Sequence, residues 1–527
     1  MWRLSPGTSF LPCALAAGLS LGASAVAHPA TFTVDTTADA VDAVPGDGIC
    51  ATAAGACSLR AAVQEANALA GPDTIDLPAG TYVLMLAGPA EDASASGDLD
   101  VHETLTITGA GAAITVIDGN ASSRVVEASQ PFQGNPRTVT LSGVTVRNGK
   151  LQDGDACEGV STPLGNTTFG GGAGLCANLV SLTLVDSVVE SNEGDAGITV
   201  FSILTTLTRS TVRDNQGYGI AWIAGGAAIT DSTISGNRGG LAVGLDESVE
   251  IDIRNSTISG NGETGISAGI VCEEGNTPEC IVSAPVTLNN VTITGHTGEA
   301  VFNGLLFVGG SPSIPGDGTS PVYVSNSVLA GNGTECRGQE RTGEGTLRSR
   351  GYNLLQTLTD CRVVDDTTGN IVGVPAKLGP LQDNGGPTAT HALLPGSPAI
   401  DAGNPAPPGS GDAACEAADQ RGVPRPSGPR CDMGAYEATC GDGDLDLGEQ
   451  CDDGNLADGD CCSAVCRLDA PGSPCAGDRD ACTDDVCDGA GTCQHVARQC
   501  DDGNPCTADS CKRGRGCIHR RLPRCNP

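Results

Sequence analysis

A short pattern of alternating apolar and polar positions recurs through the middle of the chain. It is most regular at Ile229 to Asn237, which is ITDSTISGN, and at Arg254 to Asn261, which is RNSTISGN. Looser copies end at Asn192, Asn215, His296 and Asn332, so the steps between copy ends are 23, 22, 24, 35 and 36 residues. One β-branched strand and one Gly/Asn turn per period are typical of a solenoid, whose repeats bury their apolar side by stacking. We therefore predict an all-β fold, a right-handed parallel β-helix with 22–24 residues per coil, in which the longer steps carry inserted loops.

The composition agrees with narrow coils. The chain has 527 residues, more than one compact core holds, with 75 Gly and 3% aromatic residues. Its formal net charge of −35 argues against a nucleic-acid partner, because phosphate binding requires a positive field. The acidic surface either serves solubility or attracts cations. We expect the chain to be a monomer.

The N-terminus predicts export. Arg3 precedes an apolar run from about Leu11 to Val26, and Ala25-Val26-Ala27 then favours cleavage before His28, which makes 1–27 a signal peptide. No later stretch approaches the roughly 18 apolar residues that a membrane-spanning helix needs. We expect an extracellular or cell-surface location and no transmembrane segment.

Cysteine usage fits an oxidising compartment. Of 25 cysteines, Cys13 lies in the signal peptide and 24 remain. Ten of these fall into sequence-local groups that predict disulfides. These candidate pairs are Cys50 and Cys57, Cys157 and Cys176, Cys272 and Cys280, Cys336 and Cys361, and Cys415 and Cys431. The pairing among the 14 cysteines from Cys440 onward stays open.

The region 28–135 is predicted to form an N-terminal cap and the first coils. Apolar residues at helical spacing follow Ser58, which is placed as an N-cap, and Gly71 lies just past the expected helix end. A helix here would cover the apolar end of the solenoid. The motif CSLRAA resembles the CSLREA motif of bacterial secreted β-helix proteins, with Ala61 in place of Glu. The missing capping-box carboxylate weakens the helix start by at most ~1 kcal/mol.

The region 136–345 is predicted to hold the regular coils and their inserts. The Gly-rich stretch 165–178, bracketed by Cys157 and Cys176, is expected to be a loop that leaves the side of the solenoid. Repeat alignment also predicts two columns of polar residues. The first, the asparagine ladder, contains Asn192, Asn215, Asn237, Asn261 and Asn332, with His296 as a variant rather than a catalytic histidine. The second, the turn column, contains Asp186, Arg209, Asp231, Asn255, Asn290 and Asn326.

The two columns have different expected roles. Ladder amides can bond to one another and tolerate left-handed backbone. Coils stack ~4.8 Å apart, so Arg209 should lie between two carboxylates, and Glu190 should face Arg213. These charges are either surface ion pairs, a strip that binds sugar hydroxyls, or part of a lyase site. Polygalacturonase motifs are absent, and the only catalytic candidates for a lyase are Asp186, Arg209 and Asp231.

The region 346–438 resembles the choice-of-anchor Q domain of bacterial surface proteins. The resemblance is carried by GYNLL at Gly351, by LGPLQDNGGPTATHALLPGSPAIDAGN at Leu378, and by DQRGVPRP followed by CDMGAYE. It implies an end domain that closes a β-helix. Its polar residues Asp401, Asp419, Arg421, Arg425 and Asp432 are assigned to turns and salt bridges rather than to a site.

The tail divides into a cysteine-rich repeat at 439–472 and two further repeats within 473–527, which ends in a basic terminus. The first resembles bacterial extracellular repeats of the form CGDG, GE, CDDGN. CTDDVCDGAGTCQH and CTADSCKRGRGCIH are related copies at an offset of 24 residues. Such small units need cross-links, and export favours disulfides over zinc. We expect no cofactor, with calcium as the alternative, because the tail offers oxygen ligands of the type calcium prefers; the candidates are Asp442, Asp444, Asp446, Asp452, Asp453 and Asn455.

The basic terminus, with Lys512, Arg513 and Arg515 among its residues, either docks on an anionic surface or is simply solvated. Together these features predict an adhesin-like or structural surface protein that binds a glycan or another cell-envelope polymer. The sequence leaves enzymatic activity open and favours a protein without it. The alternative is a pectate-lyase-like polysaccharide lyase on the same scaffold.

Overall fold

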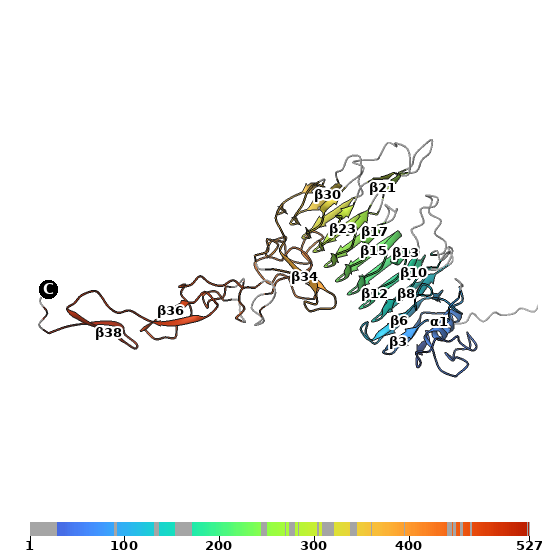
Figure 1. The fold of residues 1–527 in the computed structure, drawn as a ribbon, viewed down its shortest axis with the longest axis horizontal. Coiled ribbons are helices and arrows are strands. Elements are labelled where there is room, and N and C mark those ends of the chain that lie inside the picture. Colours follow the sequence, from blue (N-terminus) through green and yellow to red (C-terminus); the bar gives the residue numbers. More distant parts are fainter. Residues whose placement is uncertain are drawn as a thin grey trace, which may run out of the picture.

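The computed structural model is a stack of β-coils that continues into an extended C-terminal arm (Figure 1). It describes residues 29–88, 92–130, 136–152, 157, 171–243, 250–268, 270–272, 280–282, 284–302, 305–307, 321–337, 345–359, 361–394, 396–439, 445, 449–453, 457–463, 466–523 and 525. The predicted signal peptide at 1–27 lies outside the described residues. The solenoid prediction is confirmed, because parallel strand pairs connect nearly every successive coil.

Each regular coil contributes strands to three rows. Rows one and two belong to a 19-stranded sheet and share the long strands β13 and β15, and row three is an 11-stranded sheet. Row one contains β1 (Thr31–Thr33), β2 (Asp73–Leu77), β5 (Leu105–Gly109), β8 (Thr138–Ser142), β11 (Ser181–Val185), β13 (Ala196–Thr208), β15 (Tyr218–Thr230), β18 (Ile251–Arg254), β23 (Val286–Asn289), β27 (Val322–Ser325), β30 (Gly345–Arg350) and β32 (Cys361–Asp366).

The other rows have shorter strands. Row two adds β4 (Leu99–Val101), β7 (Val126–Ser129), β10 (Gly172–Asn178), β17 (Gly239–Val243), β20 (Ile266–Ala268), β25 (Glu299–Phe302) and β29 (Thr334–Arg337). Row three contains β3 (Gly80–Val83), β6 (Thr115–Asp118), β9 (Thr145–Arg147), β12 (Val188–Glu190), β14 (Thr211–Arg213), β16 (Thr233–Ser235), β19 (Thr257–Ser259), β24 (Thr292–Thr294), β28 (Val328–Ala330), β31 (Leu354–Leu355) and β33 (Ile371–Val372). A small side sheet contains β21 (Ile270–Cys272), β22 (Cys280–Val282) and β26 (Leu305–Phe307).

The core is a set of aliphatic stacks that run through the coils. In row three, Val189 pairs with Val212, which pairs with Ile234 and then Ile258. All four side chains are buried. Alternation of these residues with outward Thr and Ser is the repeat pattern of the sequence, since successive strand residues point to opposite faces. A one-residue shift would expose the whole stack, so the pattern fixes the register.

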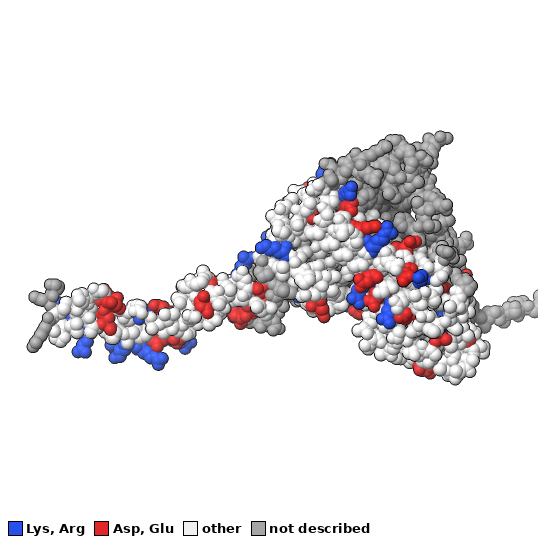
Figure 2. Space-filling view, in the orientation of Figure 1, with Lys and Arg blue, Asp and Glu red and all other residues white. Residues whose placement is uncertain are grey.

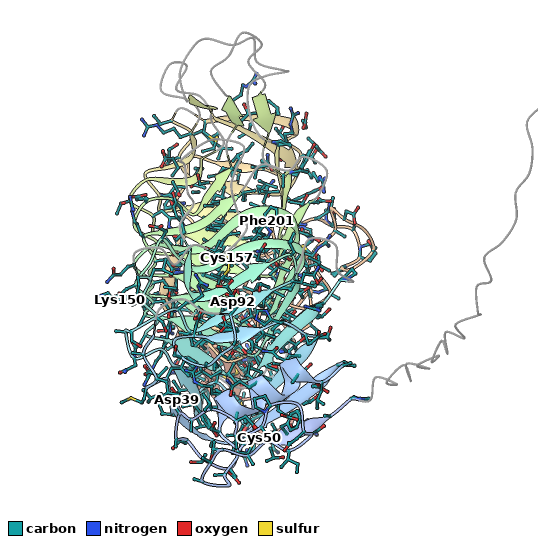
Figure 3. The ribbon with its side chains drawn as sticks, turned by 90° about the vertical axis from the view of Figure 1, so that its right-hand side faces the viewer. Asp39, Cys50, Asp92, Lys150, Cys157 and Phe201 are labelled. Atoms are coloured by element: carbon teal, nitrogen blue, oxygen red, sulfur yellow. A yellow bond between two sulfur atoms is a disulfide. The ribbon has the colours of Figure 1, made fainter. Side chains whose placement is uncertain are left out.

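The predicted helix covers the N-terminal end of the stack (Figure 1), the end at which Figure 3 labels Asp39 and Cys50. Helix α1 (Leu59–Ala68) begins after Ser58, whose side chain accepts a hydrogen bond from the Ala61 backbone N–H. Arg60 is fully buried, forms an ion pair with Asp39 and also donates to the Gly97 carbonyl. The CSLR segment therefore supplies both the helix start and a buried cation that joins the cap to the following loop.

The prediction for the Gly-rich stretch 165–178 is wrong in its second half. Gly172–Asn178 is strand β10, which is buried along its length and pairs with β7 and β13. Small residues are required here because a Cβ at Gly172 or Gly174 would meet backbone or side-chain atoms of neighbouring coils within 3 Å. Residues 158–170 lie outside the described residues.

The segment that resembles an anchor domain does not simply close the end of the solenoid. Residues 345–372 form the last coils, through β30 to β33. The chain then turns back and runs along the side of the stack, with a hairpin of β34 (Leu378–Gln382) and β35 (Thr390–Leu393). We call residues 376–438 the return segment. It contacts coils as distant as β16 and β28, through Thr233 with Ala389 and through Val328 packing in the segment's apolar cluster.

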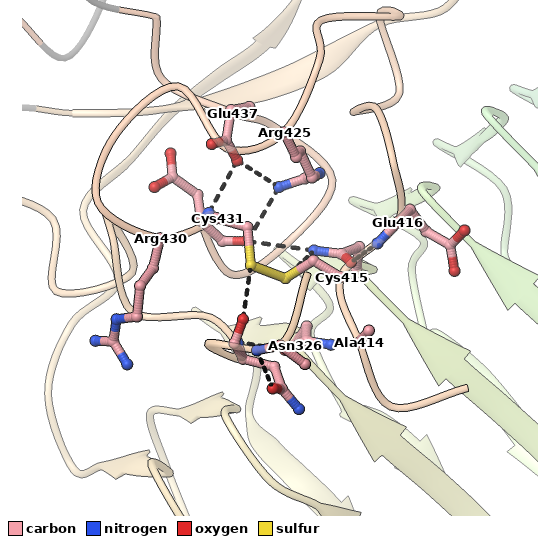
Figure 4. The surroundings of a disulfide bond; sticks show 12 residues. Asn326, Ala414, Cys415, Glu416, Arg425, Arg430, Cys431 and Glu437 are labelled. Carbon is pink, nitrogen blue, oxygen red and sulfur yellow. Dashed lines mark hydrogen bonds and ion pairs between the residues drawn. A yellow bond between two sulfur atoms is a disulfide. The ribbon is translucent and has the colours of Figure 1, made fainter. Parts of the chain in front are cut away.

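Four of the five sequence-local cysteine pairs are disulfides in the structure: Cys50–Cys57, Cys157–Cys176, Cys336–Cys361 and Cys415–Cys431. The backbones of Cys272 and Cys280 are paired between β21 and β22, but their side chains lie outside the described residues. The Cys415–Cys431 bond closes the loop of the return segment that lies against the coils (Figure 4).

Candidate functional site

The asparagine ladder lies inside the solenoid and is structural. Asn215 accepts from the Asn192 backbone and side chain, and donates through Nδ2 to Val189 O and Asn237 Oδ1. His296 continues the ladder, because its Nδ1 accepts from the Asn261 backbone N–H. Burial lowers the pKa of His296 to about 4, so the ring is neutral at physiological pH.

One detail of the ladder prediction is wrong. The left-handed backbone belongs to the residue before each ladder position, such as Asp214 with φ 55° and Gly236 with φ 66°, and not to the asparagine itself. The sharp turn sits at the outside of the coil and aims the next side chain inward. The asparagine then satisfies backbone groups in the core, which explains why it is buried.

The turn column is left-handed at all six positions, with φ between 44° and 52°. Arg209 forms a two-point ion pair with Asp186, with Nε–Oδ1 and Nη2–Oδ2 distances of 2.7 and 2.8 Å. Arg213 also pairs with the preceding coil, but its Nε and Nη2 both donate to one oxygen, Glu190 Oε2. Both arginines are more than 40% exposed, so each pair stabilises the fold by only about 0–1 kcal/mol.

The three lyase candidates, Asp186, Arg209 and Asp231, occupy equivalent turn positions on successive coils. Asp186 raises the pKa of Arg209 through hydrogen bonding, which keeps the guanidinium protonated and so less available as a general base. Asp231 does not share that ion pair; burial raises its pKa to about 6, while hydrogen bonding to Asn255 acts in the opposite direction. Within the described residues, the clusters able to hold a metal ion all lie in the C-terminal arm. Arg209 is hydrogen-bonded to Asp186, and Asp231 acts on it only through charge attraction.

The turn column changes role where the return segment covers it. Asn255 Nδ2 donates to Ala418 O, Asn290 Nδ2 donates to Asp432 O, and Asn326 Nδ2 donates to Ala413 O. Amides replace charges at these positions because a covered side chain must pair with backbone carbonyls. The change from Asp186, Arg209 and Asp231 to three asparagines is a sequence signal from which this covering segment could have been predicted.

The polar residues of the return segment hold its own loops together. Arg425 and Glu437 form an ion pair that is almost fully buried (Figure 4). Asp419 pairs with Arg421, whose guanidinium lies 3.7 Å from the centre of the Tyr436 ring. Asp432 Oδ1 accepts from the Asp401 backbone N–H. These contacts leave the five residues in turns and ion pairs.

A groove, which we call the lateral groove, lies between the return segment and row three. It has a volume of about 450 Å³ and is bounded by β12, β14 and β16 on one side and by residues 381–389 on the other. Polar and apolar side chains line it, including Thr211, Arg213, Ser235, Gln382, Asp383 and Pro387. Hydroxyl, guanidinium, amide and carboxylate groups beside a proline ring are the groups that hydrogen-bond and pack against a polyhydroxylated ligand.

The groove is firmly built on its far side. Gln420 is buried and donates to Thr233 Oγ1 and Thr388 Oγ1, while its Oε1 accepts from Thr257 Oγ1. His391 is also buried and shares a hydrogen bond with Ser259 Oγ. Residues from two distant parts of the sequence thus form the two walls. Sequence reasoning could not place them together because the repeat pattern does not describe the return segment.

The C-terminal arm is held by disulfides rather than by a large core. Cys451–Cys462 lies in the first unit. Cys461–Cys487 and Cys482–Cys511 join successive units, and Cys506–Cys525 ties the last unit to the terminal residues that follow it. Of the calcium candidates, Asp442, Asp444, Asp446 and Asn455 lie outside the described residues, whereas Asp452 and Asp453 are described and have partners.

The arm also carries two mixed clusters that were not predicted. Each contains two aspartates and the histidine of one repeat: Asp478, Asp485 and His495 in the first, and Asp502, Asp509 and His519 in the second. On the face of the arm in Figure 2, Lys and Arg gather along its lower edge. Arg513 of this basic end pairs with Asp480, so part of the positive charge is neutralised within the arm.

Comparisons with known proteins match two parts of this description. The Dictyostelium (slime mold) repeat family matches residues 476–497 and 499–520, which contain the two arm hairpins. Among solved structures, the crystal structure of pectate lyase Pel9A aligns over 79% of this chain and 98% of that chain, at 14% identity and a TM-score of 0.36. No curated protein matches.

The class of protein follows from the coordinates. It is a parallel β-solenoid with a short helix and a disulfide-rich C-terminal region. The many disulfides indicate an oxidising, extracellular environment. Among the described residues, every helix is too short or too polar to cross a membrane.

Proposed function

We propose that this is an exported, surface-associated or secreted adhesin-like protein that binds a glycan or another surface polymer in the lateral groove. The observation that carries the proposal is the groove itself, with its open side and its mixed polar and apolar lining. Its volume of about 450 Å³ lies within the range of small-ligand sites and suits a few sugar rings of a longer chain.

The ligand chemistry follows from the lining. Thr211, Ser235 and Gln382 offer neutral hydrogen-bonding groups, which pair with sugar hydroxyls of any charge. Arg213 is bound to Glu190, so it presents a partly neutralised cation rather than a free one. The proposed ligand is therefore a neutral or weakly acidic polysaccharide. We expect binding without turnover, because the candidate base Arg209 is held in an ion pair with Asp186.

A groove-blocking substitution tests the proposal. The outward side chain of Thr211 on β14 lines the groove, so Thr211→Trp fills space that the ligand needs. On an array of bacterial and plant polysaccharides, the wild-type chain should bind at least one class, and the variant should bind it at least tenfold more weakly. Thr183→Trp is the matched control, because Thr183 is an outward threonine on β11, away from the groove.

Two results would contradict the proposal. Equal binding by the wild type and Thr211→Trp would exclude the groove as the site. Conversion of pectins, alginates or other uronates to unsaturated products, with or without calcium, would establish a lyase instead if Arg209→Ala abolished it. In that case the engaged ion pair would have to open during the reaction.

A further inference from the structure

The two Asp–Asp–His clusters of the arm have the same construction. Strands β36 (Thr483–Cys487) and β37 (Cys493–Ala497) form an antiparallel hairpin in which Asp485 lies directly opposite His495. Strands β38 (Thr507–Lys512) and β39 (Gly516–Arg521) place Asp509 opposite His519. In each cluster, one ligand atom from each of the three residues lies within 4.8 Å of the others.

Disulfides hold the third residue against each hairpin. Cys475–Cys493 joins the chain just before Asp478 to the strand that carries His495. Cys500–Cys517 makes the same connection before Asp502. The separation between the loop aspartate and the histidine is therefore limited by a covalent bond. A site whose groups are already in place loses less conformational freedom when a ligand binds.

Hydrogen bonds also orient the loop aspartate. Asp478 Oδ1 accepts from the Asp480 backbone N–H and from Thr483 Oγ1. In the second repeat, Asp502 Oδ1 accepts from the Asn504 backbone N–H and from Thr507 Oγ1. Asp502 Oδ2 then faces the ring, at 3.5 Å from His519 Nδ1. Supporting bonds of this kind fix the direction in which a ligating oxygen points.

The cluster residues recur in the second repeat, whereas the residues at the tip of each hairpin differ. The residues between the paired cysteines at the hairpin tip are DGAGT in the first hairpin and KRGRG in the second, with opposite charge. The two aspartates, the threonine and the histidine nevertheless recur at an offset of 24 residues. A simple Asp–His ion pair between the strands would require neither the loop aspartate nor its threonine partner.

We propose that each cluster binds one divalent transition-metal cation of the Zn²⁺ type. The cysteines in both hairpins form disulfides and cannot coordinate a metal. The available donors are one imidazole nitrogen and two carboxylates, which together compensate the charge of a divalent cation. Imidazole favours zinc, copper or nickel over calcium, and water would complete the coordination. This inference is independent of glycan binding.

Titration calorimetry of the chelator-treated full chain with ZnCl₂ tests the proposal. We expect two equivalents of Zn²⁺ per chain. The double substitution Asp478→Asn with His495→Gln should reduce this to one, the equivalent change of Asp502 and His519 should do the same, and the combined variant should bind none. Substitution of Co²⁺ should give visible absorption bands that diminish in the same steps.

Two single substitutions in the first repeat distinguish loss of the metal site from a general change in the hairpin. Asp484→Asn lies on the same strand as Asp485, but its carboxylate pairs with Arg498 outside the cluster. This variant should keep both equivalents. Thr483→Val should weaken binding in the first repeat roughly tenfold without removing it. Intact disulfides, checked by mass spectrometry, would show that each variant is folded. Zn²⁺ stoichiometry that does not change in the cluster variants, or binding of Ca²⁺ in place of Zn²⁺, would overturn the proposal.

Discussion

Asn215 shows how a single buried amide connects three coils. It accepts from Asn192 and donates to Val189 O and Asn237 Oδ1, and its side chain is 3% exposed. Asn215→Ala would leave several buried donors and acceptors without partners. Each such group costs about 1–3 kcal/mol, partly relieved by relaxation.

We expect Asn215→Ala to reduce the free energy of unfolding by about 3 kcal/mol, measured by denaturant titration of tryptophan fluorescence. Asp214→Asn is the control, because this neighbour is exposed and keeps a residue that accepts left-handed backbone. Its effect should stay within about 0.5 kcal/mol. Equal loss in the two variants would mean that the ladder does not carry the stability assigned to it.

Asp231 gives the solenoid a dependence on pH. Burial raises its pKa to about 6, from an ordinary value of 3.8. The folded chain therefore holds this proton more tightly than the unfolded chain does. The associated stability is fully present below about pH 4 and is lost as the pH rises to about 6.

Asp231→Asn should remove this part of the pH dependence. The next three members of the turn column are already asparagines with the same left-handed backbone, so the substitution fits the site. At pH 8 the wild type carries a charged, half-buried carboxylate, so the variant should be more stable by about 1 kcal/mol. The difference is small because solvent partly screens the carboxylate and because the variant loses the attraction to Arg209. Unfolding curves at pH 4 and pH 8 check this. A pH slope equal to that of the wild type would contradict the assignment.

At the scale of elements, the repeat pattern predicted the coils and the ladder, and the helical spacing of apolar residues after Ser58 predicted the helix, because each depends on local spacing. Val189, Val212 and Ile234 are adjacent in space since each is one period further along the chain. The return segment has no such period. Its position depends on contacts such as Gln420 with Thr233, 187 residues apart. One wall of the lateral groove was therefore predictable as a strand surface, but the groove was not.

Gln420 should control how firmly the return segment lies on the coils. Gln420→Ala removes the donor to Thr233 and Thr388 and the acceptor of Thr257 at a buried site. Hydrogen exchange of residues 381–425 should become at least tenfold faster, while β12 and β19 keep their protection. Asp412→Ala, an exposed change in the same segment, should leave exchange unchanged. Uniform acceleration across the solenoid would show that the segment is not a separately opening unit.

The whole molecule combines two ways of stabilising a chain. The coils share one continuous apolar core from Phe32 to Cys361, whereas the small apolar cluster described in the arm consists of Cys451, Cys462 and Cys466 packed against Leu468. Units too small to bury a core depend on cross-links. The arm should therefore respond to reduction before the solenoid does.

Mild reduction under native conditions should unfold the arm selectively. Cys482 and Cys506 are only partly buried, whereas Cys336, Cys415 and Cys431 are at most 1% exposed and are shielded from the reductant. After treatment with a phosphine and brief proteolysis, peptides from 449–525 should disappear first, and a fragment spanning most of 29–439 should persist. Alkylation without the reductant is the control. If coil peptides were cut as quickly as arm peptides, the solenoid would have to depend on its own disulfides for stability, and stacking alone would not explain its persistence.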